Sequence, residues 1–357
     1  MRVCLIAEKH SLGCFVLPHI LELHPGLNQD AFACAFVSPY VHLNACFRYP
    51  RGLSFADYPF TGEAVYEPFS LMPTWTQFSK PSLGFLPTEF DDGTGITHYR
   101  FLQPPPMDDL QPEVVRRLKA ADVIYAAMGP GQSSTLALER CVSGLGLHVQ
   151  RLEIPRIYDL SRVALRKAFA SPSGTTDGWY GRHISEATVR RRFDFGYQVN
   201  ALAVHGRAMR LAGAASDAQV PSKYGLQILY DMRRGPPLKE GQLMDRMMGW
   251  EGSGRYEYTG NGMGRVVSRM TIPGSLVRSG LVDDLGGGIL TVSPLGHRFL
   301  GTLHPDSEDR DLPFRLEIWK AAPDGVSRVD RYLRTFFGRQ IRYQARRIDF
   351  SAGRAVI

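Results

Sequence analysis

The sequence predicts an α/β domain with a mostly parallel sheet and flanking helices, followed by a mostly helical domain. The apolar segment RVCLIAE at 2–8 is typical of a buried strand, and a helical pattern follows it directly. A second such strand, DVIYAAM at 122–128, also leads into a helix, as in sheets built from parallel strands and helical crossovers. After residue 150 the helical repeat dominates. We therefore expect domains at 1–150 and 151–357.

The composition is that of a globular protein with a sizeable core. The 357 residues are 44% hydrophobic and 22% charged. The net charge of +7 suits a polyanionic partner, although a basic surface can also serve solubility alone. Five cysteines without a CxxC pair are typical of reduced thiols and exclude a zinc ribbon and a disulfide framework. No apolar stretch approaches a membrane span, so we expect a cytoplasmic protein without membrane contact.

The first domain is expected to alternate strands and helices. Beside the two strands above, the sequence predicts helices at 11–23 and 111–121, the second with Pro112 at its start, and strands at 30–38 and 98–103. The strand at 122–128 ends in the turn Gly129-Pro130-Gly131, where a further helix begins. Residues 50–95 are rich in proline, glycine and aromatic residues, which predicts an irregular insertion.

The second domain is expected to hold two long helices and then a compact set of short elements. Helices are predicted at 160–171, 184–213, 224–235, 240–250, 265–280 and 293–303. The small, polar segment 213–222 marks a junction. The alternating segment 281–293 predicts a β-hairpin, and Ser293 with Pro294 predicts the capped start of the last of these helices. Helices followed by a two-stranded wing form the winged-helix pattern.

Four segments in this order resemble type IA DNA topoisomerases, nearest to the topoisomerase III branch. LIAEKHSLG at 5–13 resembles the start of their Toprim domain, and 151–172 is similar to the segment that leaves it. The segment 193–213 resembles the family's long helix, with Asp194 and Asn200 at the spacing of its D-x5-N pattern. The stretch 276–319 resembles the winged-helix part of the fourth domain. The resemblance implies a Toprim-like fold, a winged-helix domain and DNA as partner.

The resemblance also implies a metal loop, and this chain lacks its acids. In the family, Mg²⁺ is held by a D-x-D-x-E motif after the strand that corresponds to 122–128. Aligned on Pro130, those positions are Gly129, Gly131 and Ser133. Carboxylates are the hard ligands that Mg²⁺ prefers. We therefore expect the Mg²⁺ site to be lost, with no metal and no cofactor.

The nucleophile that the resemblance implies is missing as well. The family carries its tyrosine in a Y-x-R-T motif within an arch of two further domains. Here the junction 213–222 joins the outgoing helix to the returning segment and leaves no room for an arch. Tyr224, Tyr256 and Tyr258 lack the R-T context, which is typical of structural or surface tyrosines. The sequence therefore argues against an enzyme.

Two candidate contacts to DNA lie at the sheet edge. Glu8 and Lys9 end the first strand, where the resemblance implies an active-site acid and a DNA-contacting lysine. Glu8 alone does not hold Mg²⁺ firmly, so it is a vestigial acid, and both residues can also be inherited surface groups. The loop at 129–135 offers backbone N–H groups and the hydroxyls of Ser133 and Ser134 to a DNA phosphate. A plain turn with a helix cap, or a nucleotide site, is the alternative.

Basic residues form three clusters, which favours DNA binding over isolated solvated charges. The clusters are Arg190, Arg191 and Arg192; Arg265, Arg269 and Arg278; and Arg339, Arg342, Arg346 and Arg347. The first two lie on elements that meet DNA in the family. His205 falls where the family places a DNA-contacting basic residue, although a single helical histidine is more often structural.

Three hypotheses follow. The first is a catalytically inactive, topoisomerase-like protein that binds DNA, single-stranded, between its two domains, with DNA-processing proteins as further partners. The second is a protein-interaction accessory factor of a plasmid, phage or conjugation system. The third is a divergent type IA topoisomerase or Toprim nuclease using other acids, such as Asp91-Asp92 or Asp283-Asp284, although both pairs are typical of turns. Salt-dependent binding of an oligonucleotide and relaxation of supercoiled plasmid distinguish them.

Overall fold

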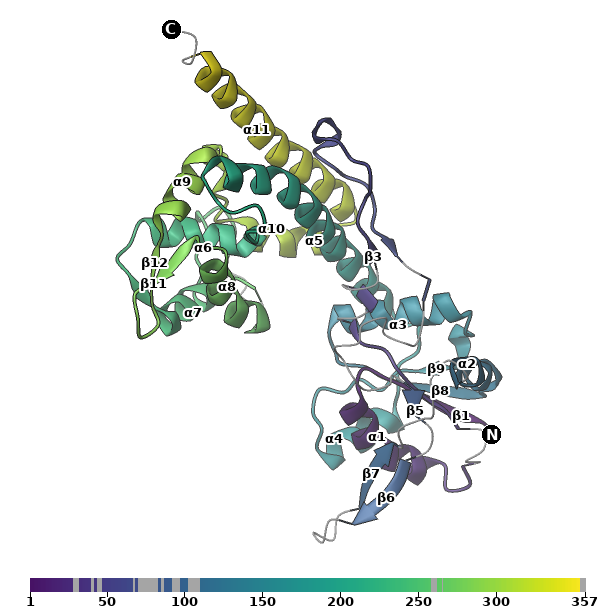
Figure 1. Ribbon diagram of the computed structural model, residues 1–357. Coiled ribbons are helices and arrows are strands. Elements are labelled where there is room, and N and C mark those ends of the chain that lie inside the picture. The colour runs from purple at the N-terminus through teal and green to yellow at the C-terminus, as the bar shows by residue number, and fades with distance from the viewer. Residues whose placement is uncertain are drawn as a thin grey trace. The chain divides into compact units, whose positions relative to one another are not determined.

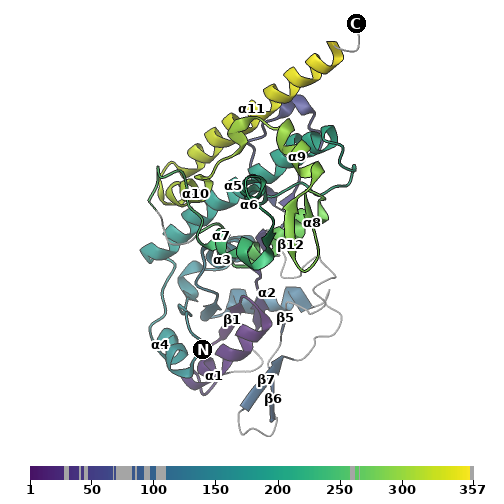
Figure 2. The ribbon, with the colours of Figure 1, turned by 90° about the vertical axis from the view of Figure 1, so that its left-hand side faces the viewer.

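A computed structural model describes most of the chain (Figures 1 and 2). The described residues are 1–27, 32–39, 42–43, 47–66, 68–69, 83–84, 87–91, 97–101, 110–257, 262–264 and 266–353. None of the helices in these ranges combines the length and the apolar character needed to cross a membrane.

The chain forms two compact units. The first comprises Met1–Arg48 and Val65–Thr188, and the second comprises Tyr49–Ala64 and Val189–Ile357. The units therefore divide at Thr188 rather than at residue 150. The reason is that residues 151–188 pack with the sheet: a strand at Leu152–Glu153 joins it, and a helix at Arg162–Ala170 contributes Leu165 and Phe169 to its core.

The first unit is built on a five-stranded sheet in the order β5-β2-β1-β8-β9. Its strands are β1 (Val3–Ala7), β2 (Cys34–Phe36), β5 (Leu83–Gly84), β8 (Val123–Ala127) and β9 (Leu152–Glu153). Four of them are parallel, and β5 pairs antiparallel at the edge. This confirms an α/β arrangement with a mostly parallel sheet. In the central register, Leu5 lies opposite Cys34 on one side and Tyr125 on the other.

Helices cover both faces of this sheet, which explains why β1 is apolar at every position. The helices are α1 (His10–Leu23), α2 (Leu110–Ala120), α3 (Gln132–Leu145) and α4 (Arg162–Ala170). Cys4 and Ile6 of β1 belong to a core with α2 and α3. Val3, Leu5 and Ala7 belong to a second core with α1 and α4. Burial on both faces is the usual condition of parallel strands.

Two short ladders stand apart from the main sheet. β3 (Phe47–Arg48) pairs with β4 (Val65–Tyr66), and β6 (Pro87–Asp91) pairs with β7 (Thr97–Phe101). The strand expected at 98–103 therefore exists, but it belongs to a hairpin. The expected insertion at 50–95 also contains regular structure, including a 3₁₀ turn at Phe55–Asp57.

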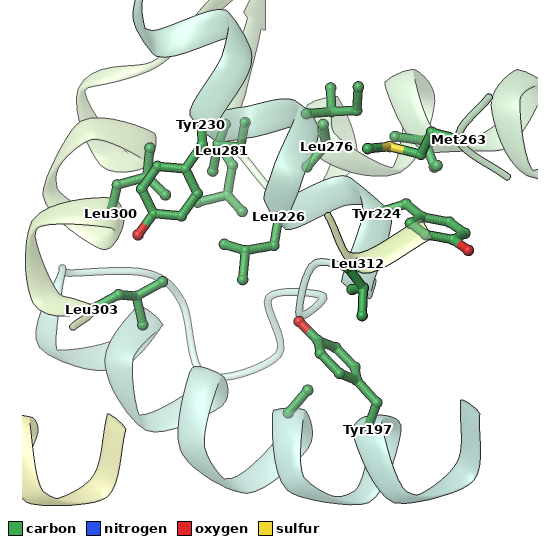
Figure 3. Close-up of a cluster of buried hydrophobic side chains, with 14 of the residues drawn as sticks. Tyr197, Tyr224, Leu226, Tyr230, Met263, Leu276, Leu281, Leu300, Leu303 and Leu312 are labelled. Carbon is green, nitrogen blue, oxygen red and sulfur yellow. The ribbon is translucent and has the colours of Figure 1, made fainter. Parts of the chain in front are cut away.

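The second unit is largely helical and has one core. Its helices are α5 (Gly178–Leu211, beginning in the first unit), α6 (Lys223–Arg233), α7 (Glu240–Met248), α8 (Val266–Arg278), α9 (Pro294–Thr302), α10 (Leu312–Ala321) and α11 (Gly325–Gly353). Figure 3 shows Leu226 of α6, Leu276 of α8 and Leu300 of α9 in this core. Helix α11 packs along α5, with Tyr197 against Phe336 at 6.0 Å between ring centroids (Figures 1 and 2).

The predicted hairpin is present. β11 (Val282–Asp284) pairs with β12 (Ile289–Val292), and β10 (Leu238–Lys239) joins the other side of β12. The turn places Gly286, Gly287 and Gly288 at positive φ, a conformation that costs glycine little. After β12, the Ser293 hydroxyl accepts a 2.9 Å hydrogen bond from the Gly296 N–H, which confirms the predicted helix cap.

Asn200 anchors the segment Tyr49–Ala64 to α5. Its side chain is fully buried, accepts from the Phe60 N–H and donates to the Phe60 and Gly196 carbonyls, each at 2.7 Å. Arg192 adds a bond to the Thr61 carbonyl. The Asn200 amide thus replaces the backbone partners that Phe60 would have in a sheet, which explains why this segment belongs to the second unit.

Replacing Asn200 with alanine is expected to destabilise the second unit. The partly buried N–H and C=O groups of Phe60 would lose their partner, which costs about 1–3 kcal/mol. Urea denaturation, followed by tryptophan fluorescence, measures the change in the free energy of unfolding. Gln198→Ala on the exposed side of the same helix is the control. Equal stability of the two variants would contradict an anchoring role for Asn200.

Candidate nucleic-acid interface

The end of β1 and the loop after β8 meet at the carboxyl edge of the first unit's sheet. Their register pairs Ala7 with Ala127, and the Glu8 N–H donates to the Ala127 carbonyl at 3.0 Å. One carboxylate oxygen of Glu8, Oε2, accepts from the Gly129 N–H at 2.7 Å and from the Ser134 hydroxyl at 2.8 Å. The loop therefore binds an acid of the same chain.

This arrangement corrects the phosphate contact expected of Ser134. The Ser134 side chain is 6% exposed, and its hydroxyl is bound to Glu8. The Gly129 N–H has the same partner. Ser133 is half-buried, and Lys9 is exposed at the N-cap of α1. Contacts of Ser133 and Lys9 with DNA stay predictions.

The residues at this edge do not fit Mg²⁺. At the end of β1 and in the loop after β8, Glu8 supplies the carboxylate, and two protein donors already engage its Oε2. The next carboxylate along this loop, Glu186 of α5, accepts a hydrogen bond from the Gln132 amide at 2.5 Å. A Cβ atom added at Gly129 would lie 2.7 Å from that oxygen, so an acid at this position would displace Glu8. Within the described ranges, no group of three His, Cys, Asp or Glu side chains is placed to hold a metal ion.

Beside the loop lies a small cleft with aromatic and cationic walls, which we name the Trp179 cleft. Its lining includes Pro130, Thr135, Arg156, Tyr158, Trp179 and His183. Arg156 and Tyr158 come from the segment after β9, whereas Trp179 and His183 lie one turn apart on α5. All of these residues belong to the first unit.

The rings of the Trp179 cleft are partly accessible. Tyr158 is 74% exposed. Trp179 is half-buried and stands edge-on to His183 with ring centroids 5.2 Å apart, and its Nε1 is buried without a hydrogen-bond partner among the described residues. Nδ1 of His183 lies 3.4 Å from the Thr135 hydroxyl. Arg156 is exposed, and no carboxylate pairs with it in the described part of the chain. The cleft therefore offers unpaired aromatic surface and a cation side by side.

Sequence reasoning missed this cleft. Its residues come from three separate segments, and none of them forms a charge run. Trp179 and His183 stand four residues apart, the spacing of one helical turn, but the sequence predicts the helix only from residue 184, whereas α5 begins at Gly178.

The arginine run on α5 proves to be structural. Arg190 binds Asp194 at 3.0 Å and the Tyr224 hydroxyl at 3.4 Å, and Lys223 also binds Asp194. Burial, together with repulsion from Arg190, lowers the pKa of Lys223 to about 8 despite the attraction of Asp194. Asp194 therefore pairs with two cations, and all three groups lie within the second unit.

The other members of the run are also engaged or enclosed. Arg192 binds both carboxylate oxygens of Asp330 on α11, at 2.8 and 3.0 Å, and its side chain is 10% exposed. Arg191 is half-buried. The structure therefore corrects the expected DNA-binding role of Arg190 and Arg192, because their guanidinium groups hold α5 to its neighbours.

His205 is another correction. It is 0% exposed and packed among aromatic rings, with Phe337 at 5.3 Å and Tyr197 at 6.0 Å between centroids. Neither ring nitrogen has a hydrogen-bond partner among the described residues. Burial lowers the pKa of His205 to about 3. It is a neutral core residue and does not reach DNA.

The three arginines of the second basic cluster, on the helix expected at 265–280, have different outcomes. Arg265 lies outside the described residues. Arg269 is half-buried, and its Nε donates to the Met263 carbonyl at 3.1 Å. Arg278 is exposed at the end of α8. A DNA contact stays a prediction for Arg269 and Arg278.

No protein-family model and no curated protein sequence matches the chain. Among solved structures, full-length topoisomerase I from Thermotoga maritima is similar with a TM-score of 0.33 and 8% sequence identity. The match covers 76% of this chain and 37% of that protein, so the chain spans well under half of its length. A similarity of this size does not define a family.

The burial of His205 predicts a pH-dependent loss of stability. The unfolded chain takes up a proton near pH 6.5, whereas the folded protein does so only near pH 3. Stability from this group is therefore complete above pH 6.5 and is lost as the pH falls toward 3. By pH 5 the loss amounts to about 2 kcal/mol.

Urea denaturation of wild type and His205→Leu at pH 7.5 and pH 5 measures this effect. The variant should lose about 2 kcal/mol less than wild type between the two pH values. His148→Leu, at an exposed position, should behave as wild type. An identical pH dependence in wild type and His205→Leu would show that His205 is not enclosed.

Proposed function

We propose that the protein binds single-stranded DNA, with the Trp179 cleft as a principal contact, and that it does not catalyse topoisomerase chemistry. The observation that carries the proposal is the juxtaposition of exposed Tyr158 and unpaired Arg156 beside a sheet-edge loop whose acid is already bound. The resemblance of the sequence to type IA topoisomerases supports DNA as the partner.

The chemistry of the cleft suits a single strand. Proteins that bind single strands stack bases on aromatic side chains and follow the backbone with cations. Tyr158 offers an exposed ring, and Arg156 supplies a positive charge two residues away. A base stacked on Tyr158 would leave its phosphate within reach of Arg156. Paired bases in a duplex do not expose a face for such stacking.

The element order in the second unit supports a winged helix as a further DNA-binding element. Helix α6, strand β10, helices α7 and α8, and the hairpin β11–β12 follow one another in the order of that motif. In this assignment α8 is the recognition helix, and the hairpin is the wing. Arg278 is an exposed cation at the end of α8.

The tyrosines and spare acids support an inactive protein. Tyr224 is 5% exposed, and its hydroxyl accepts a hydrogen bond from Arg190. Tyr256 is half-buried, and Tyr258 lies outside the described residues. Asp284 accepts from the Gly286 N–H within the hairpin turn, as expected of turn chemistry. These contacts favour a binding protein over a divergent nuclease.

Fluorescence anisotropy with a labelled oligothymidine tests the proposal. Wild type should bind the oligonucleotide, and the logarithm of its binding constant should fall linearly with the logarithm of the salt concentration. The double variant Arg156→Gln/Tyr158→Ala should bind about 10–100-fold more weakly, because it removes one stacking platform and one cation. The matched control is Arg116→Gln/Phe15→Ala, two exposed residues of the same unit that do not line the cleft.

If both double variants bind the oligonucleotide as tightly as wild type, the Trp179 cleft is not a principal contact with the single strand. Failure of wild type to bind the oligonucleotide at low salt would overturn DNA binding altogether. Relaxation of negatively supercoiled plasmid by wild type with Mg²⁺, absent from a Tyr224→Phe variant, would contradict the inactive assignment.

A further inference from the structure

Helix α11 has two faces of opposite chemistry along its described side chains. One face is buried in the second unit's core and carries Val329, Leu333, Phe336, Phe337, Gln340 and Gln344. The other is exposed and carries Arg328, Arg331, Arg334, Arg339, Arg342 and Arg346. At 100° per residue, the six arginines fall within a sector of about 140°, opposite the buried face. We name this surface the arginine ridge.

Four arginines of the ridge have no carboxylate partner within the described part of the chain. Arg328 pairs with Asp324 at 2.7 Å, and Arg339 pairs with Asp306. Arg331, Arg334, Arg342 and Arg346 have no such pair. Between 325 and 346 the helix contains one acid, Asp330, and Arg192 binds it. The ridge therefore presents at least four uncompensated positive charges.

These four charges lie on one side of the helix and follow its axis. From Arg331 to Arg346 the helix rises about 22 Å, at 1.5 Å per residue. B-form DNA carries one negative charge per roughly 1.7 Å of its axis, so phosphates are available along the whole ridge. Because the arginines lie on a helix that is already ordered, the backbone loses little conformational entropy when they bind phosphates.

The ridge lacks what single strands require. The described tyrosines of the helix contact other rings: Tyr332 stacks on Phe336 with centroids 5.4 Å apart, and Tyr343 stands edge-on to His304 at 5.4 Å. Among the aromatic side chains of α11 that the structure describes, Tyr332 and Tyr343 are half-buried and Phe336 and Phe337 are buried. Cations without stacking surfaces suit the phosphate backbone of a duplex, whose bases are already stacked on one another.

We infer that the arginine ridge of α11 is a second nucleic-acid surface, which binds the backbone of double-stranded DNA without reading its sequence. The inference rests on the proposed function in that it takes DNA as the partner. It differs from the proposed function in the form of DNA, which is a duplex, and in the binding surface, which lies on the second unit. The protein would then bind a single strand through the Trp179 cleft and a duplex through the ridge.

The test compares a 30-base-pair duplex with a 30-nucleotide oligothymidine, both fluorescently labelled, over a range of salt. The ridge variant is Arg331→Gln/Arg334→Gln/Arg342→Gln/Arg346→Gln. The matched control, Arg2→Gln/Arg116→Gln/Arg162→Gln/Arg166→Gln, removes the same charge from exposed positions of the first unit. Circular dichroism verifies that both variants retain their helix content.

The ridge variant should lose duplex affinity by at least tenfold at low salt. The slope of log K against log salt should become shallower by about 3–4, because four phosphate contacts release four fewer counterions. Its affinity for oligothymidine should stay within threefold of wild type. The control should bind both probes nearly as wild type does.

The alternative outcomes separate the two proposals. Unchanged duplex binding by the ridge variant, with oligothymidine binding intact, would overturn the ridge and leave the proposed function standing. An equal loss for both probes would also overturn it, since one shared surface would then serve both forms of DNA. Absence of binding to either probe in wild type would overturn the proposed function itself.

Discussion

The carboxylate of Glu8 organises the sheet edge on which the proposed function depends. The parallel pairing of β1 with β8 brings Glu8 to the loop, and two hydrogen bonds to its Oε2 hold Gly129 and Ser134 in place. Gly129 and Pro130 in turn form one side of the Trp179 cleft. Where the type IA resemblance implies a cluster of acids around a metal, this chain uses one acid as a structural acceptor. Glycine at position 129 makes this possible, since a side chain there would collide with Glu8.

The sequence predicted the elements whose structure depends on neighbouring residues, such as apolar strands, helix caps and glycine turns. The apolar runs at 2–8 and 122–128 form central strands because helices cover both faces of the sheet. Ser293 and the glycines of the hairpin have roles that depend on their immediate neighbours. Features that depend on distant contacts were not predictable in this way. Asn200 binds Phe60, 140 residues away, and so carries the segment Tyr49–Ala64 into the second unit.

The candidate site shows the same division. Sequence identified the loop at 129–135 and Glu8, but it did not reveal that the two bind each other. It gave Arg190, Arg192 and His205 as candidate DNA contacts, although it noted that a single helical histidine is more often structural. A run of arginines and a helical histidine look alike in sequence whether they face solvent or a core. In the structure, Asp194 and Asp330 neutralise the arginines, and aromatic rings enclose the histidine. The charges without partners lie elsewhere, at Arg156 and along α11.

The most direct test of the central claim is photo-crosslinking of the wild-type protein to a short single strand that contains 5-bromodeoxyuridine. Mass spectrometry of the digested complex then identifies the residues next to a base. Stacking in the Trp179 cleft predicts crosslinks to Tyr158 or Trp179, since bromouracil reacts readily with aromatic side chains that contact it. Crosslinks confined to other parts of the chain, under conditions where the strand is bound, would contradict the assignment of the cleft as the single-strand site.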